Sequence, residues 1–308
     1  MPRKIPVLVL FAPTATGKTE LLFKLFGGND KARVISADSM QVYRGMDIGT
    51  AKPTLAEQKI LPHYLIDIKN PDEQFSVAEF VECADGLCER FYNEGAVPVV
   101  CGGTGFYVRS FLLGLPSTPT GDEAMRAALR AELEERGKAE MWKELLEADP
   151  DSAKKIDPAD SYRVLRALEI YRLTGKPRAD FAQSPKLREK YDFTTIILER
   201  GREELYRRIE ERVDKMFEAG LEAEARGLMQ KYGADAPGMQ AIGYREFFEK
   251  SASGEPLSTA EIMEKIKRDS KKYAKKQCVF TRGIPGATTI RMDGGEAAAI
   301  TEAVAALR

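Results

Sequence analysis

The feature that most constrains the fold is the octet Ala-Pro-Thr-Ala-Thr-Gly-Lys-Thr at residues 12–19. It follows the apolar run Ile-Pro-Val-Leu-Val-Leu-Phe at 5–11, and the residues from about Gly17 onward predict a helix. The octet is a variant of the phosphate-binding P-loop in which Ala12 replaces the first glycine. A strand, such a loop and a helix in that order are typical of a parallel α/β sheet, so the octet predicts both a fold class and an anion site.

The residue types of the octet explain how it would hold an anion. Successive backbone N–H groups and the N-terminus of the next helix surround phosphate oxygens, Lys18 adds a point charge, and the Thr19 hydroxyl is a ligand for Mg²⁺. An ordinary strand-to-helix turn is the alternative, but Lys18 is unfavourable at a helix N-terminus unless an anion lies there. A nucleoside triphosphate is the default ligand. The residues predicted to bind phosphates are Ala12, Pro13, Thr14, Ala15, Thr16, Gly17, Lys18 and Thr19.

Short runs rich in valine and isoleucine alternate with longer amphipathic stretches through most of the chain. This alternation predicts an α/β fold, a P-loop nucleotide-kinase-like parallel sheet flanked by helices. Residues 117–190 contain no convincing strand and predict an all-helical insertion domain, whereas 1–116 and 191–308 form the P-loop core with its C-terminal helices. Besides 5–11, the predicted strands are 33–36, 64–67, 96–101 and 194–199.

Histidine and cysteine usage excludes several kinds of site. His63 is the only histidine, so sites that need two histidines, such as His-Glu-x-x-His zinc sites, are excluded. The four cysteines show no Cys-x-x-Cys spacing, which favours a reduced, cytoplasmic protein. The longest apolar runs are far shorter than the roughly 18 residues of a membrane-spanning helix, so we expect no membrane association.

The net charge of −1 hides a local excess of positive charge. Residues 265–282 carry lysine and arginine throughout and a single acidic residue, Asp269. Apolar residues recur at helical spacing within the same stretch. It therefore predicts a basic helix that either contacts an RNA backbone or presents a solvated face over an apolar stripe, and we favour RNA.

Polar residues follow other predicted strands, at the carboxyl edge where parallel sheets bind ligands. Asp38 follows the second strand and is a candidate general base, with a helix N-cap or Asx turn as the alternative. Thr104 follows a Gly-Gly pair after 96–101 and offers a hydroxyl. Asp67 ends an apolar run and is either a neighbour of Mg²⁺ or a turn residue, and His63 is interpreted as a packed or loop histidine.

Together these motifs resemble the tRNA dimethylallyltransferase family of prenyltransferases across most of the chain. The most specific are Asp-Ile-Gly-Thr-Ala-Lys-Pro at 47–53 and Arg-x-x-Arg-Ala-Leu-Glu at 163–169, since a generic P-loop fold requires neither. Two departures are Ala12 and the absence, near Arg282, of the tryptophan that commonly precedes an arginine in the family's final motif. The other motifs are the octet, Asp-Ser-Met-Gln-Val-Tyr at 38–43, Pro-His at 62–63, Leu-Ile-Asp at 65–67, Gly-Gly-Thr at 102–104, Gln-Ala-Ile-Gly-Tyr-Arg-Glu at 240–246 and Tyr-Ala-Lys-Lys-Gln at 273–277.

The resemblance implies transfer of a dimethylallyl group from dimethylallyl diphosphate to N6 of adenosine 37, beside the anticodon of tRNAs that read codons starting with U, with release of diphosphate. The loop would hold the diphosphate together with Mg²⁺, and Asp38 would accept the N6 proton. The partner implied is the tRNA anticodon stem-loop, and we expect the protein to be a monomer. The catalytic residues implied are Asp38, Lys18, Thr104 and Arg212. The tRNA-binding residues implied are Asp38, Ser39, Met40, Gln41, Thr104, Arg126, Tyr162, Arg163, Arg166, Gln240, Gly243, Tyr244 and Arg245.

Three other functions stay open at this point. An adenylate isopentenyltransferase prenylates a free nucleotide, which would need neither the helical insertion nor the basic helix. A small-molecule P-loop kinase would use Asp38 toward a hydroxyl acceptor but leaves the motifs at 163–169 and 240–244 unexplained. A non-catalytic RNA-binding or nucleotide-switch protein would not require a carboxylate at the crevice. Arg163 and Arg166 share a helix face that suits either RNA phosphates or a solvated face paired with Glu169.

Overall fold

The computed structural model describes residues 3–28, 31–119, 121–251, 253–281 and 283–293. The chain divides into two compact units, Met1–Leu112 with Leu187–Arg308, and Leu113–Lys186. The first unit carries the sheet and the second is helical in its described part. Each unit has its own apolar core, so each is described by itself.

The first unit is built on a six-stranded sheet in the order β3-β2-β4-β1-β5-β6, and every neighbouring pair is parallel. The chain therefore confirms the predicted fold class. The strand at 5–11 has the predicted bounds, and three others agree to within a few residues. The strands are β1 (Ile5–Phe11), β2 (Ala32–Ser36), β3 (His63–Tyr64), β4 (Val97–Gly102), β5 (Tyr191–Glu199) and β6 (Ala287–Arg291).

Two strand predictions differ from the structure. The strand expected at 64–67 is only His63–Tyr64, because Leu65 and Asp67 adopt positive φ angles of 62° and 56° that end the extended backbone. The edge strand β6 was not predicted. Its residues are mostly exposed or half-buried, with Ile290 alone buried, so it lacks the continuous apolar run that marked the central strands.

Helices cover the sheet because its strands are apolar on both faces. Leu21, Leu22 and Phe26 of α1 (Lys18–Phe26) pack in one cluster with Leu8 and Leu10 of β1. On the other side, α3 (Val77–Asn93) contacts β1, β2 and β4, and its N-terminus is fixed by a capping box between Ser76 and Glu79. The remaining short helices of this region are α2 (Leu55–Ile60) and α4 (Gly105–Leu113).

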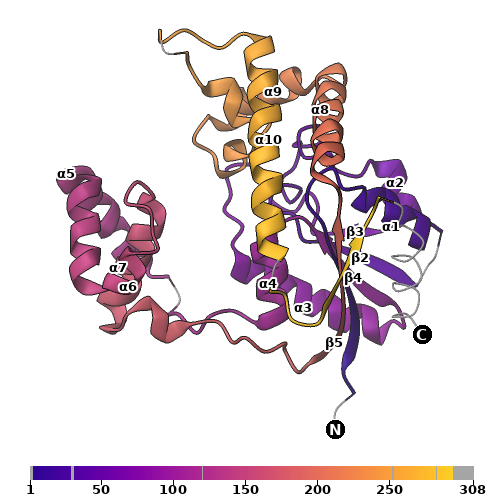
Figure 1. Ribbon diagram of the computed structural model, residues 1–308, viewed down its shortest axis with the longest axis horizontal. Helices are drawn as coiled ribbons and strands as arrows, with labels where there is room; N and C mark the ends of the chain where they lie inside the picture. The colour runs from indigo at the N-terminus through magenta and orange to yellow at the C-terminus, as the bar shows by residue number, and fades with distance from the viewer. Residues whose placement is uncertain (1–2, 29–30, 120, 252, 282, 294–308) are drawn as a thin grey trace. The chain divides into compact units, whose positions relative to one another are not determined.

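The C-terminal helices form a second layer around the loops that leave the sheet. Helices α8 (Arg202–Glu218) and α10 (Thr259–Thr281) lie side by side (Figure 1) and are joined by the ion pairs Lys271–Glu210 and Lys267–Asp214. Helix α9 (Leu221–Tyr232) and two 3-10 turns, η2 (Pro237–Gln240) and η3 (Arg245–Phe248), complete the layer. A cluster centred on the fully buried Tyr244 joins these elements to residues 42–48.

The second unit is a small helical bundle in its described part. A cluster that includes Leu129, Met141 and Leu168 forms its core. Arg172 bridges Glu132 and Glu144, and its hydrogen bonds lower the pKa of Glu132 to about 2. Its helices are α5 (Glu123–Ala148), α6 (Pro150–Ala153), α7 (Ser161–Thr174) and the 3-10 turn η1 (Arg178–Phe181). No helix in the described ranges of either unit has the length and apolar character needed to span a membrane.

Candidate active site

The topology of the sheet brings three loops to one edge. Parallel strands β1, β2 and β4 end at Phe11, Ser36 and Gly102, and the residues that follow them meet at the carboxyl edge. A cavity of about 1380 Å³ opens there, larger than the roughly 300–1,000 Å³ of a site for one small molecule. It therefore has room for more than a single small ligand.

The octet at 12–19 joins β1 to α1, as predicted: residues 12–17 form the loop, and Lys18 and Thr19 are the first residues of the helix. Ala15 and Gly17 have positive φ angles of 63° and 101°, and α1 begins at Lys18. Two arginines that sequence reasoning missed fix this backbone from outside. Arg208 donates to the Ala15 carbonyl at 2.8 Å, and Arg200 donates to the Thr16 carbonyl at 2.9 Å.

Gln277 of α10 connects the phosphate loop to the loop that follows β4. Its Oε1 accepts the Thr14 N–H at 3.0 Å, and its Nε2 donates to the Gly103 carbonyl at 2.7 Å. A Cβ at Gly103 would lie 2.6 Å from this Nε2, so a side chain there would push the Gln277 amide away from its partner. The Tyr-Ala-Lys-Lys-Gln motif at 273–277 thus has a structural role at the site.

Positive charge gathers around the loop without matching carboxylates. Lys18 and Arg212 both line the cavity, and neither has an acidic partner in the described part of the chain. Burial lowers the pKa of the Arg212 guanidinium and the charge of Asp38 opposes that shift, and an arginine stays protonated in either case. The Thr16 hydroxyl is buried at the same loop with no partner among the described residues. Such a site suits a ligand that brings several negative charges.

Asp38 lies at the carboxyl end of β2 and faces this cavity. Its Oδ1 accepts the backbone N–H groups of Met40 at 2.9 Å and Gln41 at 3.3 Å. No hydrogen bond to Oδ2 occurs within the described chain, and Asp38 lines the cavity. The Asx turn that the sequence left open is therefore present on one oxygen, and the other oxygen is available to a ligand.

Thr104 lies against the Asp38 turn. Its Oγ1 accepts the Ser39 N–H at 2.9 Å, and its own N–H donates to the Ala37 carbonyl at 3.1 Å. A Cβ on Gly102 would lie 2.1 Å from the Ala37 oxygen, so only glycine allows the two loops to meet. Burial beside the charge of Asp38 raises the pKa of Tyr273 to about 12, which keeps its hydroxyl protonated as a donor at neutral pH.

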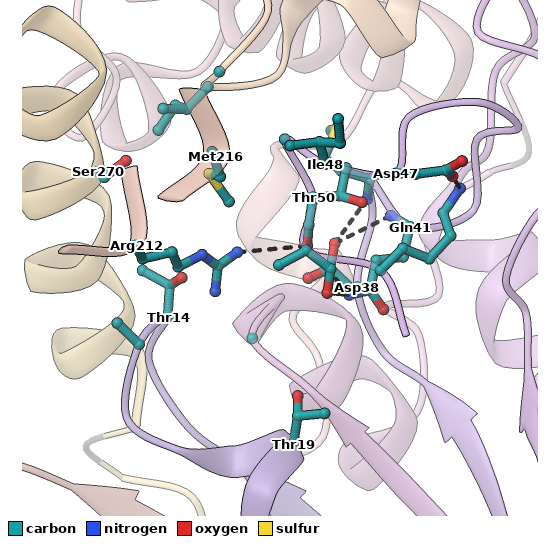
Figure 2. A pocket seen from close by; sticks show the side chains of 18 of the residues that line it. Thr14, Thr19, Asp38, Gln41, Asp47, Ile48, Thr50, Arg212, Met216 and Ser270 are labelled. Atoms are coloured by element: carbon teal, nitrogen blue, oxygen red, sulfur yellow. Dashed lines mark hydrogen bonds and ion pairs between the residues drawn. The ribbon is translucent and has the colours of Figure 1, made fainter. Parts of the chain in front are cut away.

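The loop at 47–53 lines the cavity on the side of Asp38, which we call the acceptor side. Gln41 donates from Nε2 to the carbonyls of Thr50 and Ala51, both at 3.3 Å. Figure 2 shows Arg212 extending from α8 toward Thr50, whose carbonyl it reaches at 3.5 Å. Thr19 lies at the floor of the same cavity with its hydroxyl directed into it (Figure 2).

Asp67 is engaged by a lysine. Lys52 is almost completely buried, and its Nζ contacts Asp67 at 2.5 Å and Asp47 at 2.6 Å. Since Asp67 also has a positive φ angle, it acts as a turn residue that neutralises Lys52. This arrangement favours the structural interpretation of Asp67 over a role beside Mg²⁺. His63, the only histidine in the sequence, is half-buried in β3, where burial lowers the pKa of its imidazole.

The residues at 240–245 that were predicted to bind tRNA have different surroundings. Gln240 is exposed and lines the cavity, and Arg245 also lines it while pairing with Glu246 and Asp269. Gly243 has a φ angle of 98°. The Tyr244 side chain is fully buried, so it supports the loop from within and has no surface to offer an RNA. For this side chain the expectation of direct RNA contact is corrected.

The arginines of the second unit are paired within that unit. Arg126 and Arg166 both contact the buried carboxylate of Glu169, at 2.9 and 2.6 Å. Arg163 pairs with Asp160 at 2.8 Å, and the neighbouring Tyr162 is 81% exposed. An exposed tyrosine beside an exposed arginine is the chemistry that stacks on and neutralises single-stranded RNA.

The basic stretch of α10 is less available than its sequence indicates. Most of its lysines pair with acidic residues, as in Lys267–Asp214, Lys265–Glu249 and Lys272–Asp269. Lys275 and Lys276 are exposed without an acidic partner in the described chain. Arg282, near which the family's tryptophan is absent from the sequence, lies outside the described residues.

Comparisons with known proteins agree with one another. A family model described as IPP transferase matches residues 41–283. The chain is 42% identical over 279 residues to tRNA dimethylallyltransferase 2 of Geotalea daltonii, covering 90% of this chain and 85% of that protein. It is 41% identical over 303 residues to the tRNA dimethylallyltransferase of Geobacillus kaustophilus, covering 97% and 94%.

Two solved structures are also similar. The full-length tRNA isopentenylpyrophosphate transferase of Bacillus halodurans is 37% identical, with a TM-score of 0.67 and coverage of 98% of this chain and 97% of that one. A eukaryotic dimethylallyltransferase, described as acting on tRNA, is 28% identical, with a TM-score of 0.76 and coverage of 92% and 73%. Both similarities extend over nearly the whole chain.

The bridge made by Gln277 gives a prediction about stability. Gln277→Ala leaves the Thr14 N–H and the Gly103 carbonyl without their partner in a buried place, so we expect the free energy of unfolding to fall by about 1–3 kcal/mol. Urea denaturation measures the change. Gln230→Ala on the exposed side of α9 is the matched control and should change the free energy of unfolding by less than about 0.5 kcal/mol. Equal effects of the two substitutions would contradict the bridge.

Proposed function

This chain belongs to the IPP transferase family, and from that premise we propose that it transfers a dimethylallyl group from dimethylallyl diphosphate to N6 of adenosine 37 of tRNA. Dimethylallyl transfer to tRNA is the activity named for the relatives to which it is 41–42% identical. The position of the modified adenosine and the preference for tRNAs that read codons starting with U are the finer parts of the proposal.

One observation carries the proposal. A single cavity holds an anion-binding loop, whose Lys18 forms no ion pair among the described residues, together with the carboxylate of Asp38. Prenyl transfer needs this pair of sites, since a diphosphate leaves while an amine loses a proton. Apolar side chains, among them Ile48 and Met216, also line the cavity (Figure 2) and suit a five-carbon chain.

The reaction follows from these positions. The N6 lone pair attacks the allylic carbon, the bond from that carbon to the diphosphate oxygen breaks, and the N6 proton passes to Oδ2 of Asp38. Lys18, the loop N–H groups and Arg212 stabilise the negative charge that grows on the departing diphosphate. Thr104 holds the Asp38 turn through Ser39, so its role is to keep the acceptor side in place.

The oxygen donors at the loop fit Mg²⁺. Thr19 supplies a hydroxyl at the first turn of α1, which suits a hard cation held mainly by diphosphate oxygens and water. When bound, Mg²⁺ would add positive charge beside the leaving diphosphate. No further step depends on it.

The target adenine has to leave its stack to reach a carboxylate inside a cavity. Unstacking costs a few kcal/mol and is least for a base already in a loop, which favours an anticodon stem-loop as substrate. Ser39, Met40 and Gln41 line the acceptor side, where such a base would lie.

We further propose that Tyr162, Arg163 and the Arg126–Arg166 pair contact the RNA from the second unit, and that the protein acts as a cytoplasmic monomer.

The proposed function is tested by following label from dimethylallyl diphosphate, with Mg²⁺, into an anticodon stem-loop with adenosine 37 and, in parallel, into AMP. We expect label on adenosine 37 only, and a large loss of transfer when EDTA removes the metal. Label on AMP alone would indicate an adenylate isopentenyltransferase. Label on neither would favour a small-molecule P-loop kinase or a non-catalytic RNA-binding protein.

Replacing the proposed base separates chemistry from binding. Asp38→Asn keeps an oxygen for the Met40 and Gln41 amides but cannot take the N6 proton, so we expect kcat to fall by about 10²–10⁴-fold with little change in tRNA affinity. Single-turnover transfer and filter binding measure the two quantities. Asp72→Asn, at an exposed aspartate, is the control. A parallel loss of both quantities would make Asp38 a purely structural residue.

Arg166 distinguishes RNA contact from a purely internal ion pair. If Arg166 meets an RNA phosphate, Arg166→Ala should weaken tRNA binding and reduce the slope of log affinity against log salt by about 1. Binding titrations between low and physiological salt measure this slope. Arg130→Ala, an exposed arginine on α5 paired with Glu123, is the matched control. An unchanged slope with lower stability would restrict Arg166 to its bond with Glu169.

A further inference from the structure

We propose that Glu224 of α9 is a positioning residue that holds the loop at 47–53, and through it Asp38, in place. This proposal rests on the proposed function. Glu224 does not line the cavity, and none of the motifs singled out in the sequence contains it. Its carboxylate is nevertheless the centre of a hydrogen-bond cluster beneath the loop at 47–53.

The carboxylate of Glu224 binds three successive backbone amides. Oε2 accepts the N–H of Asp47 at 3.2 Å and of Ile48 at 2.9 Å, and Oε1 accepts the N–H of Ile48 at 3.0 Å and of Gly49 at 3.2 Å. Consecutive N–H groups that converge on one anion form a nest, and charged acceptors make the stronger hydrogen bonds. Glu224 therefore fixes the direction in which this loop leaves residue 46.

Tyr244, the residue that precedes η3, completes the cluster. Its hydroxyl donates to Oε1 of Glu224 at 2.6 Å and accepts the Gly49 N–H at 3.1 Å. Burial and the neighbouring charge of Glu224 raise the pKa of Tyr244, so the hydroxyl stays protonated and continues to donate. A Cβ on Gly49 would lie 2.5 Å from the ring, so the ring and the loop are in direct contact.

Hydrogen bonds through Gln41 link the position of this loop to that of Asp38. The carbonyls of Thr50 and Ala51 accept hydrogen bonds from Nε2 of Gln41, and the Gln41 backbone N–H donates to Oδ1 of Asp38. The chain of contacts thus runs from Glu224 through the loop and Gln41 to the proposed base. Arg212, on the diphosphate side, reaches the same Thr50 carbonyl. That contact is long, at 3.5 Å, so a shift of the loop would disturb mainly the side of the cavity that holds Asp38.

The role requires a carboxylate. The amide of a glutamine would accept with its oxygen only, and its NH₂ group would face a backbone N–H, so at least one of the three amides would lose its partner. An aspartate is shorter by one methylene group and could not reach all three amides without moving the loop. The site is built on α9, whose Leu221 and Ala225 are buried in the surrounding core.

The test compares Glu224→Gln with Glu222→Gln in the labelled transfer assay. Glu222 lies on the same helix but pairs at the surface with Arg226 and Thr259. For Glu224→Gln we expect kcat to fall by about 10–100-fold, since displacement of reacting groups by about 1 Å costs up to 10²-fold, while KM for dimethylallyl diphosphate changes less than about twofold. The Glu222→Gln enzyme should match the unmodified one.

The split between kcat and KM is a signature that a loss of stability alone would not produce. A displaced Asp38 turn slows the chemical step at saturating substrate, so the loss should lie in kcat while the affinity for dimethylallyl diphosphate is kept. An unchanged kcat in a folded Glu224→Gln protein would overturn the proposal. So would equal losses in kcat and in affinity for both substrates that follow the melting temperature.

A second variant covers the case in which Glu224→Gln does not fold. Tyr244→Phe keeps the ring against Gly49 and removes only the hydroxyl that joins Glu224 to the loop, and it should lower kcat by about 3–10-fold with little change in KM for dimethylallyl diphosphate. A Tyr244→Phe enzyme with normal kcat would overturn the proposal. If the unmodified enzyme transfers no label, the proposed function itself fails, and the failure is distinct because it does not depend on either variant.

Discussion

The structure depends on the parallel pairing of β4 between β1 and β2. In this register Phe11 pairs with Gly102, and Ser36 pairs with Cys101, so three loops leave the sheet at the same level. Backbone hydrogen bonds at the edge continue this order, from Ala37 to the Cys101 carbonyl and from Thr104 to the Ala37 carbonyl. The phosphate loop, Asp38 and Thr104 are neighbours because of these bonds, although up to 92 residues separate them along the chain.

The same edge separates two kinds of charge. Cationic groups surround the loop after β1, and the carboxylate follows β2 on the other side of the cavity. Arg212 lies between them, since it feels the charge of Asp38 and contacts Thr50. One side chain therefore connects the two sides of the cavity.

Local sequence predicted the parts of the fold and site that local physics determines. The strand at 5–11, the phosphate loop and the helix after it each follow from a contiguous pattern, and Asp38 follows from its place after a strand. The remaining features depend on contacts between distant residues. Arg200, directly after β5, and Arg208 of α8 both reach the loop, Lys52 neutralises Asp67, and Tyr244 is buried. None of these features has a local signal in the sequence.

The contact between Gly49 and Tyr244 explains why two specific motifs occur together. The run at 47–53 and the run at 240–246 are not required by a P-loop sheet, yet each supplies one side of the same junction. Gly49 leaves room for the ring, and a side chain at this position would force the loop away from Glu224. At Gly243 a Cβ would make only an ordinary contact with Gly49 at 3.8 Å, so glycine is favoured there by its φ angle of 98°. The specificity of these motifs therefore comes in part from packing beneath the acceptor side, so residues with no access to the cavity constrain the chemistry within it.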